Sequence, residues 1–242
     1  NMAYTYEMMR QLDDAILRAR MDEGVHVIVL CGAGEKFFCA GADIGMLAEV
    51  SPTFKYYFCL HANETLSRLE QTPKLVIAAL NGHTVGGGLE IAMAADLRIG
   101  RRGAGKVGLP EVSLGVLPGT GGTQRLSRIV GKSRAIELMV TGRTFDFDEA
   151  KAMGIVDDVY DAESRDAFME QVLAYARQFT PPPRAAKAAG HIKRAVPTGW
   201  GPPRAEAPAG EREPPPLLFQ SHDAREGLTA YTEKRKPEFE GR

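Results

Sequence analysis

An alternation of helical and strand-like segments is the feature that most restricts the fold of this chain. Apolar residues recur at helical spacing after Thr5, which we expect to cap a helix that stops at Gly24. Each helical segment is followed by a short apolar run of the kind that is buried in parallel sheets. The predicted segments, in chain order, are helix 6–23, strand 25–30, helix 53–70 and strand 75–80. This order favours parallel strands joined by crossover helices, and therefore an α/β fold.

Two capping-box patterns predict further helices in the second half of the chain. Asp146 and Glu149 have the required spacing and precede a helix, which is followed by a predicted strand over 155–160. Asp223 and Glu226 repeat the spacing, so we expect a last helix to begin there.

The C-terminal part of the chain differs in composition from the rest. The segment 197–216 is dense in proline, which removes helical hydrogen bonds, and this predicts a loop or linker. Basic residues accumulate over 177–204 without any acidic residue, although the whole chain has a formal net charge of −1. A solvated charged face and a site for phosphate or a partner both fit this stretch.

Composition excludes several classes of protein. A near-zero net charge argues against a chain built to hold nucleic acid. The apolar runs are strand-sized, so no membrane span is expected and the chain is predicted to be soluble. The three cysteines, Cys31, Cys39 and Cys59, are too few for a disulfide framework and form no C-x-x-C pair. We therefore expect a reducing compartment, the cytoplasm or, in a eukaryote, the mitochondrial matrix.

Glycine-rich turns are the candidate sites of chemistry. The run 86–88 joins a strand to a helix whose first N–H groups have no internal partner, so it can hold an oxygen that gains negative charge. The dinucleotide pattern G-x-G-x-x-G is absent, because Ile91 occupies the place of its last glycine. Segments 37–44 and 117–126 are similarly rich in small residues. Glu90 and Glu111 lie beside these turns and could move protons on either side of a bound molecule, although an isolated glutamate is more often a solvated surface residue.

Four motifs together resemble the enoyl-CoA hydratase (crotonase) family. They are F-x-A-G-A-D-I (38–44), N-G-x-x-x-G-G-G-x-E (81–90), G-x-P-E (108–111) and L-P-G-x-G-G-T-Q-R-L (117–126). The resemblance implies a spiral of repeated ββα units over 1–160 as the catalytic core. It also implies a helical region over 161–242 that forms trimers, usually paired into hexamers.

The resemblance also assigns roles to nine residues. They are Ala42 and Gly87 as N–H donors of an oxyanion hole, Glu90 and Glu111 as catalytic glutamates, Gly119 as a backbone donor that helps hold water, Ala40, Asp43 and Ile44 as main-chain contacts to the adenine of CoA, and Lys234 as a contact to the CoA of a neighbouring subunit. The implied reaction is reversible addition of water to a 2-enoyl-CoA thioester, with Glu111 protonating the α-carbon and Glu90 activating water. No metal or redox cofactor is implied, and coenzyme A is part of the substrate.

Three departures and several alternatives accompany this interpretation. The chain starts at a helix where the family begins with strands, position 45 is glycine where relatives often have a basic residue, and the proline-rich 197–216 replaces an expected helix. Other activities in the family are isomerisation, thioester hydrolysis and hydration or dehydration of branched, methylglutaconyl-CoA type substrates. A non-catalytic CoA-ester carrier or an RNA-binding relative is the alternative from a different class. His83 could act as a base, but we expect a structural role.

Overall fold

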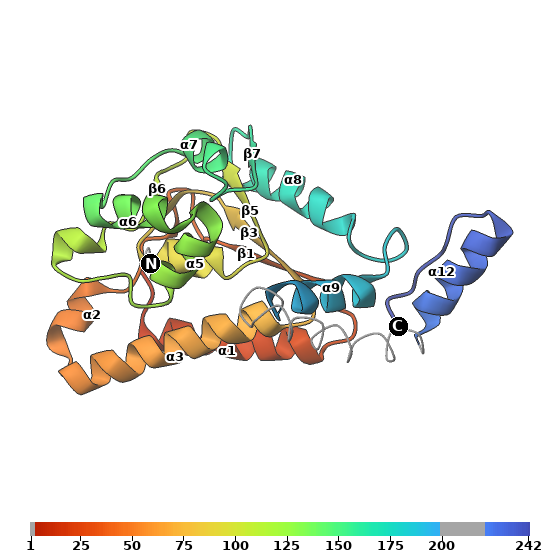
Figure 1. Cartoon of the computed structure of the whole chain (residues 1–242), viewed down its shortest axis with the longest axis horizontal. Helices are drawn as coiled ribbons and strands as arrows, with labels where there is room; N and C mark the ends of the chain where they lie inside the picture. The colour runs from red at the N-terminus through yellow and green to blue at the C-terminus, as the bar shows by residue number, and fades with distance from the viewer. Residues whose placement is uncertain (1–2, 199–220) are drawn as a thin grey trace.

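The computed structural model describes residues 3–198 and 221–242 and contains two parallel sheets with helices packed around them (Figure 1). The strands are β1 (Val27–Cys31), β2 (Phe37–Cys39), β3 (Leu75–Leu80), β4 (His83–Val85), β5 (Leu97–Arg101), β6 (Val107–Gly108) and β7 (Asp158–Tyr160). The helices are α1 (Tyr6–Met21), α2 (Ile44–Glu49), α3 (Pro52–Gln71), α4 (Gly87–Met93), the 3-10 helix η1 (Glu111–Leu114), α5 (Gly122–Val130), α6 (Lys132–Thr141), α7 (Phe147–Ala152), α8 (Arg165–Arg177), α9 (Ala186–Thr198) and α12 (His222–Glu233).

Consecutive strands belong alternately to the two sheets. One sheet has the order β1-β3-β5-β7 and the other β2-β4-β6, and every pairing within them is parallel. One strand of each sheet and the helix that follows form one turn of a spiral, and the next such unit adds the neighbouring strand to each sheet. The expected α/β spiral of ββα units is confirmed.

Burial along the strands follows their place in the first sheet. β3 lies between β1 and β5, and five of its six residues are buried, as its unbroken apolar sequence predicts. The prediction of a buried strand over 25–30 was only partly right. β1 begins at Val27, lies at the edge of this sheet and is half-buried up to an exposed Cys31, because one side of it has no strand neighbour among the described residues.

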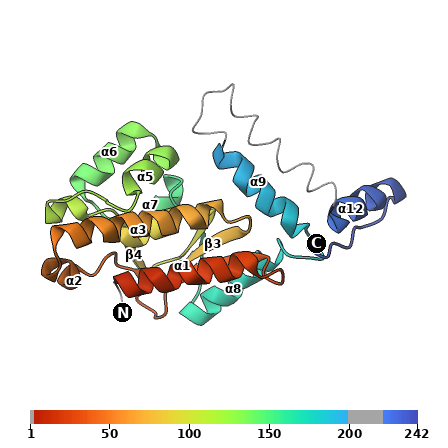
Figure 2. The same cartoon turned by 90° about the horizontal axis from the view of Figure 1, so that it is seen from below.

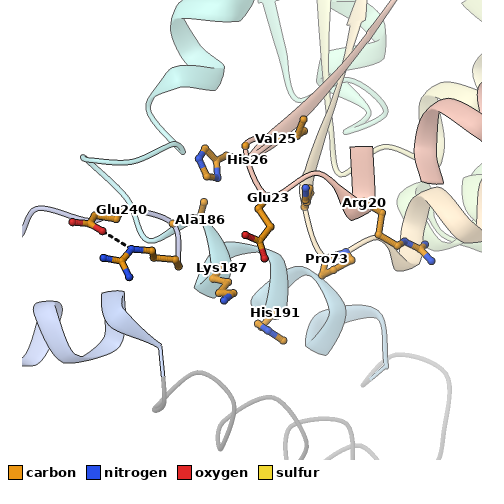
Figure 3. A pocket seen from close by; sticks show the side chains of 13 residues that line it. Arg20, Glu23, Val25, His26, Pro73, Ala186, Lys187, His191 and Glu240 are labelled. Carbon is orange, nitrogen blue, oxygen red and sulfur yellow. Dashed lines mark hydrogen bonds and ion pairs between the residues drawn. The ribbon is translucent and has the colours of Figure 1, made fainter. Parts of the chain in front are cut away.

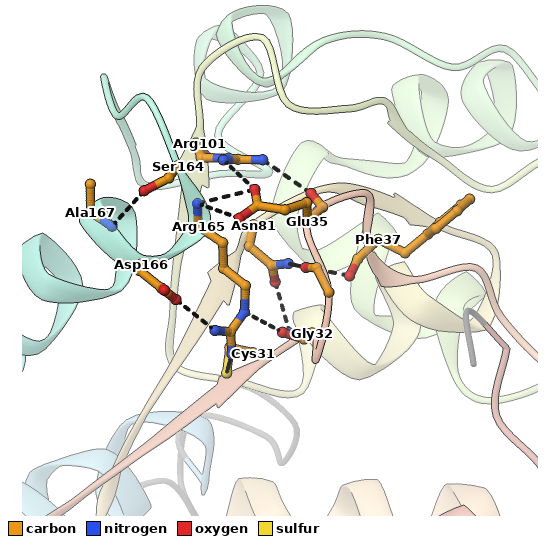
Figure 4. Close-up of polar contacts among 11 residues, drawn as sticks. Cys31, Gly32, Glu35, Phe37, Asn81, Arg101, Ser164, Arg165, Asp166 and Ala167 are labelled. Carbon is orange, nitrogen blue, oxygen red and sulfur yellow. Dashed lines mark hydrogen bonds and ion pairs between the residues drawn. The ribbon is translucent and has the colours of Figure 1, made fainter.

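A polar network anchors the loop that joins β1 to β2 (Figure 4). The Asn81 side chain, which is fully buried after β3, accepts from the Gly32 N–H at 2.7 Å and donates to the carbonyls of Gly34 and Phe37. On the outer side of the loop, Glu35 accepts from the Arg101 guanidinium at 2.9 Å. Backbone groups in a tight loop need such partners when water is excluded. The network therefore fixes where β2 starts and, through β2, where the site segment after it lies.

The predicted helix caps agree with the structure in two places and differ in one. Thr5 and Asp146 each accept a hydrogen bond from the first turn of the helix that follows, as N-caps do. Ser51, which the sequence analysis did not name, caps α3 in the same way. The predicted capping box of Asp223 and Glu226 is wrong. Ser221 caps α12 instead, and Asp223 is buried within the first turn, where its carboxylate accepts the N–H groups of residues 240 and 241. Both Ser221 and Asp223 are residues that can cap a helix. Because Asp223 accepts hydrogen bonds from the C-terminal segment, Ser221 is the cap.

The helices cover the sheets in two layers. α1 and α3 run side by side on one side of the molecule, and the buried apolar residues of α8 pack on β3 and β5 from the other (Figure 2). α12 lies apart from the sheets in both views, on the far side of α9. Most of the predicted proline-rich loop over 197–216 lies outside the described residues, and α9 ends at Thr198.

Candidate active site

The glycine run 86–88 forms the turn between β4 and α4. Gly86 has φ 56° and ψ −134°, a backbone conformation that side chains disfavour, and α4 begins directly after it at Gly87. The N–H groups of Leu89 and Glu90 both donate to the Gly86 carbonyl. The first N–H groups of a helix have no partner within it, so the N–H of Gly87 is available to a ligand.

The segment after β2 lies directly against this turn. A Cβ built on Gly41 would lie 3.0 Å from the Gly87 nitrogen, and one built on Gly88 would lie 2.0 Å from the Cys39 carbonyl oxygen. Such approach is possible only for glycine. The two backbones that carry the predicted oxyanion-hole residues, Ala42 and Gly87, are therefore brought together.

Ala42 is oriented by a short parallel bridge to Tyr4. The Tyr4 N–H donates to the Gly41 carbonyl at 2.8 Å, and the Asp43 N–H donates to the Tyr4 carbonyl at 2.9 Å. In a parallel bridge the residue between these two partners points its own N–H the other way. The N–H of Ala42 therefore faces away from Tyr4.

Glu90 is buried under the 117–122 loop. Its carboxylate, 2% exposed on α4, accepts from the N–H groups of Thr120 at 2.8 Å and Gly122 at 2.7 Å. Burial raises the pKa of Glu90, and these two N–H donors, the Thr120 hydroxyl and the Arg125 guanidinium oppose the rise. One carboxylate oxygen is thus firmly held, while the group is poised to accept a proton.

Glu111 begins η1 and approaches the glycine turn from the other side. Its Oε1 would lie 3.2 Å from a Cβ built on Gly86, and its Oε2 is buried without a hydrogen-bond partner among the described residues. Burial raises the pKa of Glu111 to about 7; its own backbone N–H opposes this, and the charge of Glu90 adds to it. The structure therefore brings the two predicted glutamates into electrostatic contact, and an unpartnered buried carboxyl oxygen is well suited to exchange a proton with a ligand.

The other predicted residues are placed less tightly. Gly119 lies in the loop above Glu90, where its carbonyl accepts from the Asn63 amide at 2.8 Å. Asp43 caps α2 through the Met46 N–H, and the neighbouring Ile44 is 60% exposed.

Ala40 lies beside the glycine turn, whereas Lys234 lies at the end of α12. The Ala40 carbonyl lies 3.9 Å from a Cβ built on Gly86, beside the turn. Lys234 is exposed at the C-terminal cap of α12, a helix that lies apart from the sheets (Figure 1). It does not join this chain's own site.

Three residues around Glu90 were missed by sequence reasoning. Tyr4, Thr120 and Gly122 contact either the carboxylate or the turn that carries it. Thr120 and Gly122 lie within the 117–126 motif. They hold Glu90 through backbone N–H groups, which cannot be recognised from the type of side chain. Tyr4 precedes the first helix by two residues and nothing in its neighbourhood distinguishes it.

A separate cavity of about 520 Å³ lies at the opposite ends of the strands (Figure 3). It is lined by residues of the α1–β1 turn, of α9 and of the C-terminal segment, among them Glu23, Lys187 and His191. None of the predicted site residues lines it. Within residues 3–198 and 221–242, no three His, Cys, Asp or Glu side chains are grouped so as to hold a metal ion.

Part of the basic stretch serves the fold. Lys193 is buried, with its ammonium 3.0 Å from Asp96 Oδ2 and bonded to the carbonyls of Leu69 and Lys74. His83, as expected, has a structural contact, since its Nδ1 accepts from the Lys106 N–H at 3.1 Å. No helix in the described part of the chain is long and apolar enough to cross a membrane.

Comparison with solved structures assigns this arrangement to the crotonase fold. A crystal structure of an enoyl-CoA hydratase from Geobacillus kaustophilus superimposes with a TM-score of 0.93 at 44% identity, covering 99% of this chain and 89% of that one. A structure of an enoyl-CoA hydratase from Bacillus anthracis gives a TM-score of 0.90 at 32% identity, covering 99% and 91%.

Sequence comparison then gives the family. The family model described as enoyl-CoA hydratase/isomerase matches residues 1–242. The short-chain-enoyl-CoA hydratase of Clostridium acetobutylicum is 38% identical over 98% of this chain and 88% of that protein. The crotonyl-CoA hydratase of Syntrophomonas wolfei is 35% identical over 98% and 89%. This chain belongs to the enoyl-CoA hydratase/isomerase family.

Proposed function

We propose that this protein is an enoyl-CoA hydratase that adds water reversibly to the 2,3-double bond of a short 2-enoyl-CoA. The observation that carries the proposal is the pair of glutamates at the glycine turn, with Glu90 buried under the 117–122 loop and the half-buried Glu111 against Gly86. Burial raises the pKa of both carboxyl groups. The names of the Clostridium and Syntrophomonas relatives support a short acyl chain.

In the proposed reaction the two carboxyl groups share one proton. The Glu90 carboxylate accepts a proton from water as the water oxygen bonds to the β-carbon. The electron pair of the double bond moves toward the thioester, whose oxygen gains negative charge and is held by the N–H groups of Ala42 and Gly87. Glu111 then donates its proton to the α-carbon. The pair ends with one proton, now on Glu90, and this proton returns to Glu111 before the next turnover, so no reactant other than water and the enoyl thioester is consumed.

The remaining roles complete the proposal. Gly119 would help hold the water, Ala40, Asp43 and Ile44 would contact the adenine of CoA, and Lys234 would contact the CoA bound to a neighbouring subunit. The exposed position of Lys234 on α12, away from the chain's own site, supports a contact between subunits. We propose a trimer or hexamer built through the 161–242 region, and a cytoplasmic location.

The experiment that tests the function offers straight-chain 2-enoyl-CoAs of four and eight to ten carbons and a branched one. Loss of the conjugated thioester is followed by absorbance and the product is identified. Formation of 3-hydroxyacyl-CoA, fastest with the four-carbon substrate, supports the proposal. A shifted double bond without water addition would identify an isomerase, the second activity in the family's description. Tight CoA-ester or salt-sensitive RNA binding without turnover would contradict an enzyme.

The pH dependence should reflect the shared proton. Hydration requires the singly protonated pair, so kcat/KM is expected to fall about tenfold per pH unit above the pKa of about 7 given for Glu111. Dehydration of the 3-hydroxyacyl-CoA must show the same profile, because the overall reaction releases no proton. Profiles measured in both directions check this. A flat alkaline side up to pH 9 would contradict a working pKa near 7.

The Gly87→Ala variant is expected to lose hydration about 10²-fold, near the cost of losing one oxyanion-hole donor. A Cβ at this position would lie 2.7 Å from the Tyr4 ring, so the turn must shift and the Gly87 N–H with it. The matched control is Gly34→Ala, whose Cβ meets nothing within 4 Å. Steady-state kinetics of both variants test this prediction. Equal activity in both would contradict the assignment of the Gly87 N–H to the oxyanion hole.

A further inference from the structure

Tyr4 contacts the backbone beside Ala42, the glycine turn at Gly87 and the loop that holds Glu90, although the reaction described above gives it no role. Its main chain forms the bridge that orients Ala42. Its ring is 2% exposed and lies against the Gly87 Cα, where a Cβ would be 2.7 Å from both Cε1 and the hydroxyl. The other face of the ring is stacked on Phe58, with centroids 5.7 Å apart.

The hydroxyl of Tyr4 continues the contact toward Glu90. Tyr4 Oη and Thr120 Oγ1 are 3.3 Å apart and buried. The Thr120 backbone N–H in turn donates to Glu90 Oε1 at 2.8 Å. The Tyr4 hydroxyl therefore contacts the residue whose N–H holds the Glu90 carboxylate. Burial raises the pKa of the Tyr4 phenol, and the charge of Glu90 adds to the rise, so the phenol keeps its proton.

We propose that Tyr4 is a positioning residue for hydration, which ties the oxyanion hole to the proton-accepting carboxylate through its hydrogen bond to Thr120, the residue whose backbone N–H donates to Glu90. This rests on the proposed function. The main chain of Tyr4 orients Ala42, its ring lies against Gly87, and its hydroxyl is hydrogen-bonded to Thr120. A buried hydrogen bond fixes the position of both partners, so Tyr4 can affect Glu90 through Thr120 without touching it.

The test combines Tyr4→Phe and Thr120→Val in a double-mutant cycle. Tyr4→Phe keeps the ring on Gly87 and removes only the hydroxyl, so we expect kcat to fall about fivefold to tenfold with KM unchanged, the cost of about one buried hydrogen bond. Thr120→Val removes the same hydrogen bond and should cost at least as much. The double variant should cost no more than Thr120→Val alone, because either substitution already breaks the Tyr4–Thr120 contact.

The Glu90 titration gives a readout that needs no turnover. With 13C-labelled glutamate, the carboxyl resonance of Glu90 should titrate at higher pH in Tyr4→Phe than in the unmodified protein. The control Tyr6→Phe, a neighbouring tyrosine that packs on Phe54 and is 39% exposed, should leave kinetics and titration unchanged. Thermal unfolding reports whether Tyr4→Phe retains the fold.

Two outcomes overturn the inference. One is a Tyr4→Phe enzyme with the kcat and the Glu90 titration of the unmodified protein, and the other is costs that multiply in the double variant. A protein that hydrates no enoyl-CoA but shows the shifted titration would instead contradict the proposed function and leave the link from Tyr4 through Thr120 to Glu90 intact.

Discussion

The Glu111→Gln enzyme is expected to hydrate a four-carbon 2-enoyl-CoA roughly 10²- to 10⁴-fold more slowly than the unmodified enzyme, the range for removing a positioned acid. Glutamine has nearly the same shape, so the turn at Gly86 can keep its geometry, but an amide cannot deliver a proton to the α-carbon. Because Oε2 of Glu111 has no partner within the described residues, the substitution breaks no hydrogen bond there. The loss should therefore be in kcat rather than in folding.

Three measurements isolate this effect. Thermal unfolding should change little, since Glu111 ionises with difficulty and its neutral form already resembles an amide. The alkaline decline near pH 7 should disappear with the group that causes it. Glu163→Gln, an exposed glutamate ahead of α8, is the matched control and should retain full activity. Hydration within twofold of the unmodified enzyme in Glu111→Gln would refute its role.

The Glu90→Gln enzyme should lose hydration over the same range, roughly 10²- to 10⁴-fold, for a different reason. Here the proton acceptor for water is removed, and a carbonyl oxygen of the amide can still accept from Thr120 and Gly122. The loop over 117–122 can then remain in place. An amide carries no charge, so the contribution of Glu90 to the raised pKa of Glu111 is lost as well.

The second effect provides the decisive measurement. In Glu90→Gln the Glu111 carboxyl should titrate below its value of about 7, because the like charge beside it has gone. Carboxyl 13C resonances of labelled glutamate follow both groups separately. If Glu111 titrates unchanged, the two carboxyls do not interact, and a shared proton is excluded even where the activity is low.

Elements whose structure is determined by neighbouring residues could be predicted from the sequence, and those determined by distant residues could not. β3 was predicted with its observed bounds, because an unbroken apolar run of six residues has one solution at the centre of a parallel sheet. Asp223 was misassigned, because the partners that bury it, the N–H groups of residues 240 and 241, belong to a tail whose return no local pattern announces.

The same distinction applies to the site. Gly86, Gly87 and Glu90 lie within five consecutive residues, so the sequence alone predicted that they are close together. The approach of Gly41 to Gly87, and of Glu111 to Gly86, joins segments that are distant in the chain, and only the motif resemblance anticipated it. Tyr4 could not be found, since its relation to Thr120 spans 116 positions and involves no repeated pattern.

The alternation of strands between the two sheets has a consequence for how the chain folds. Within residues 3–198 and 221–242, no strand pairs with its immediate successor, so neither sheet can begin as a hairpin. β1 pairs with β3, where Val27 lies opposite Leu75, 48 positions further on (75 − 27). Such non-local pairing slows folding. During synthesis, the Glu90 carboxylate can be held by the N–H groups of Thr120 and Gly122 only after residue 122 has left the ribosome, so the site cannot form before that point.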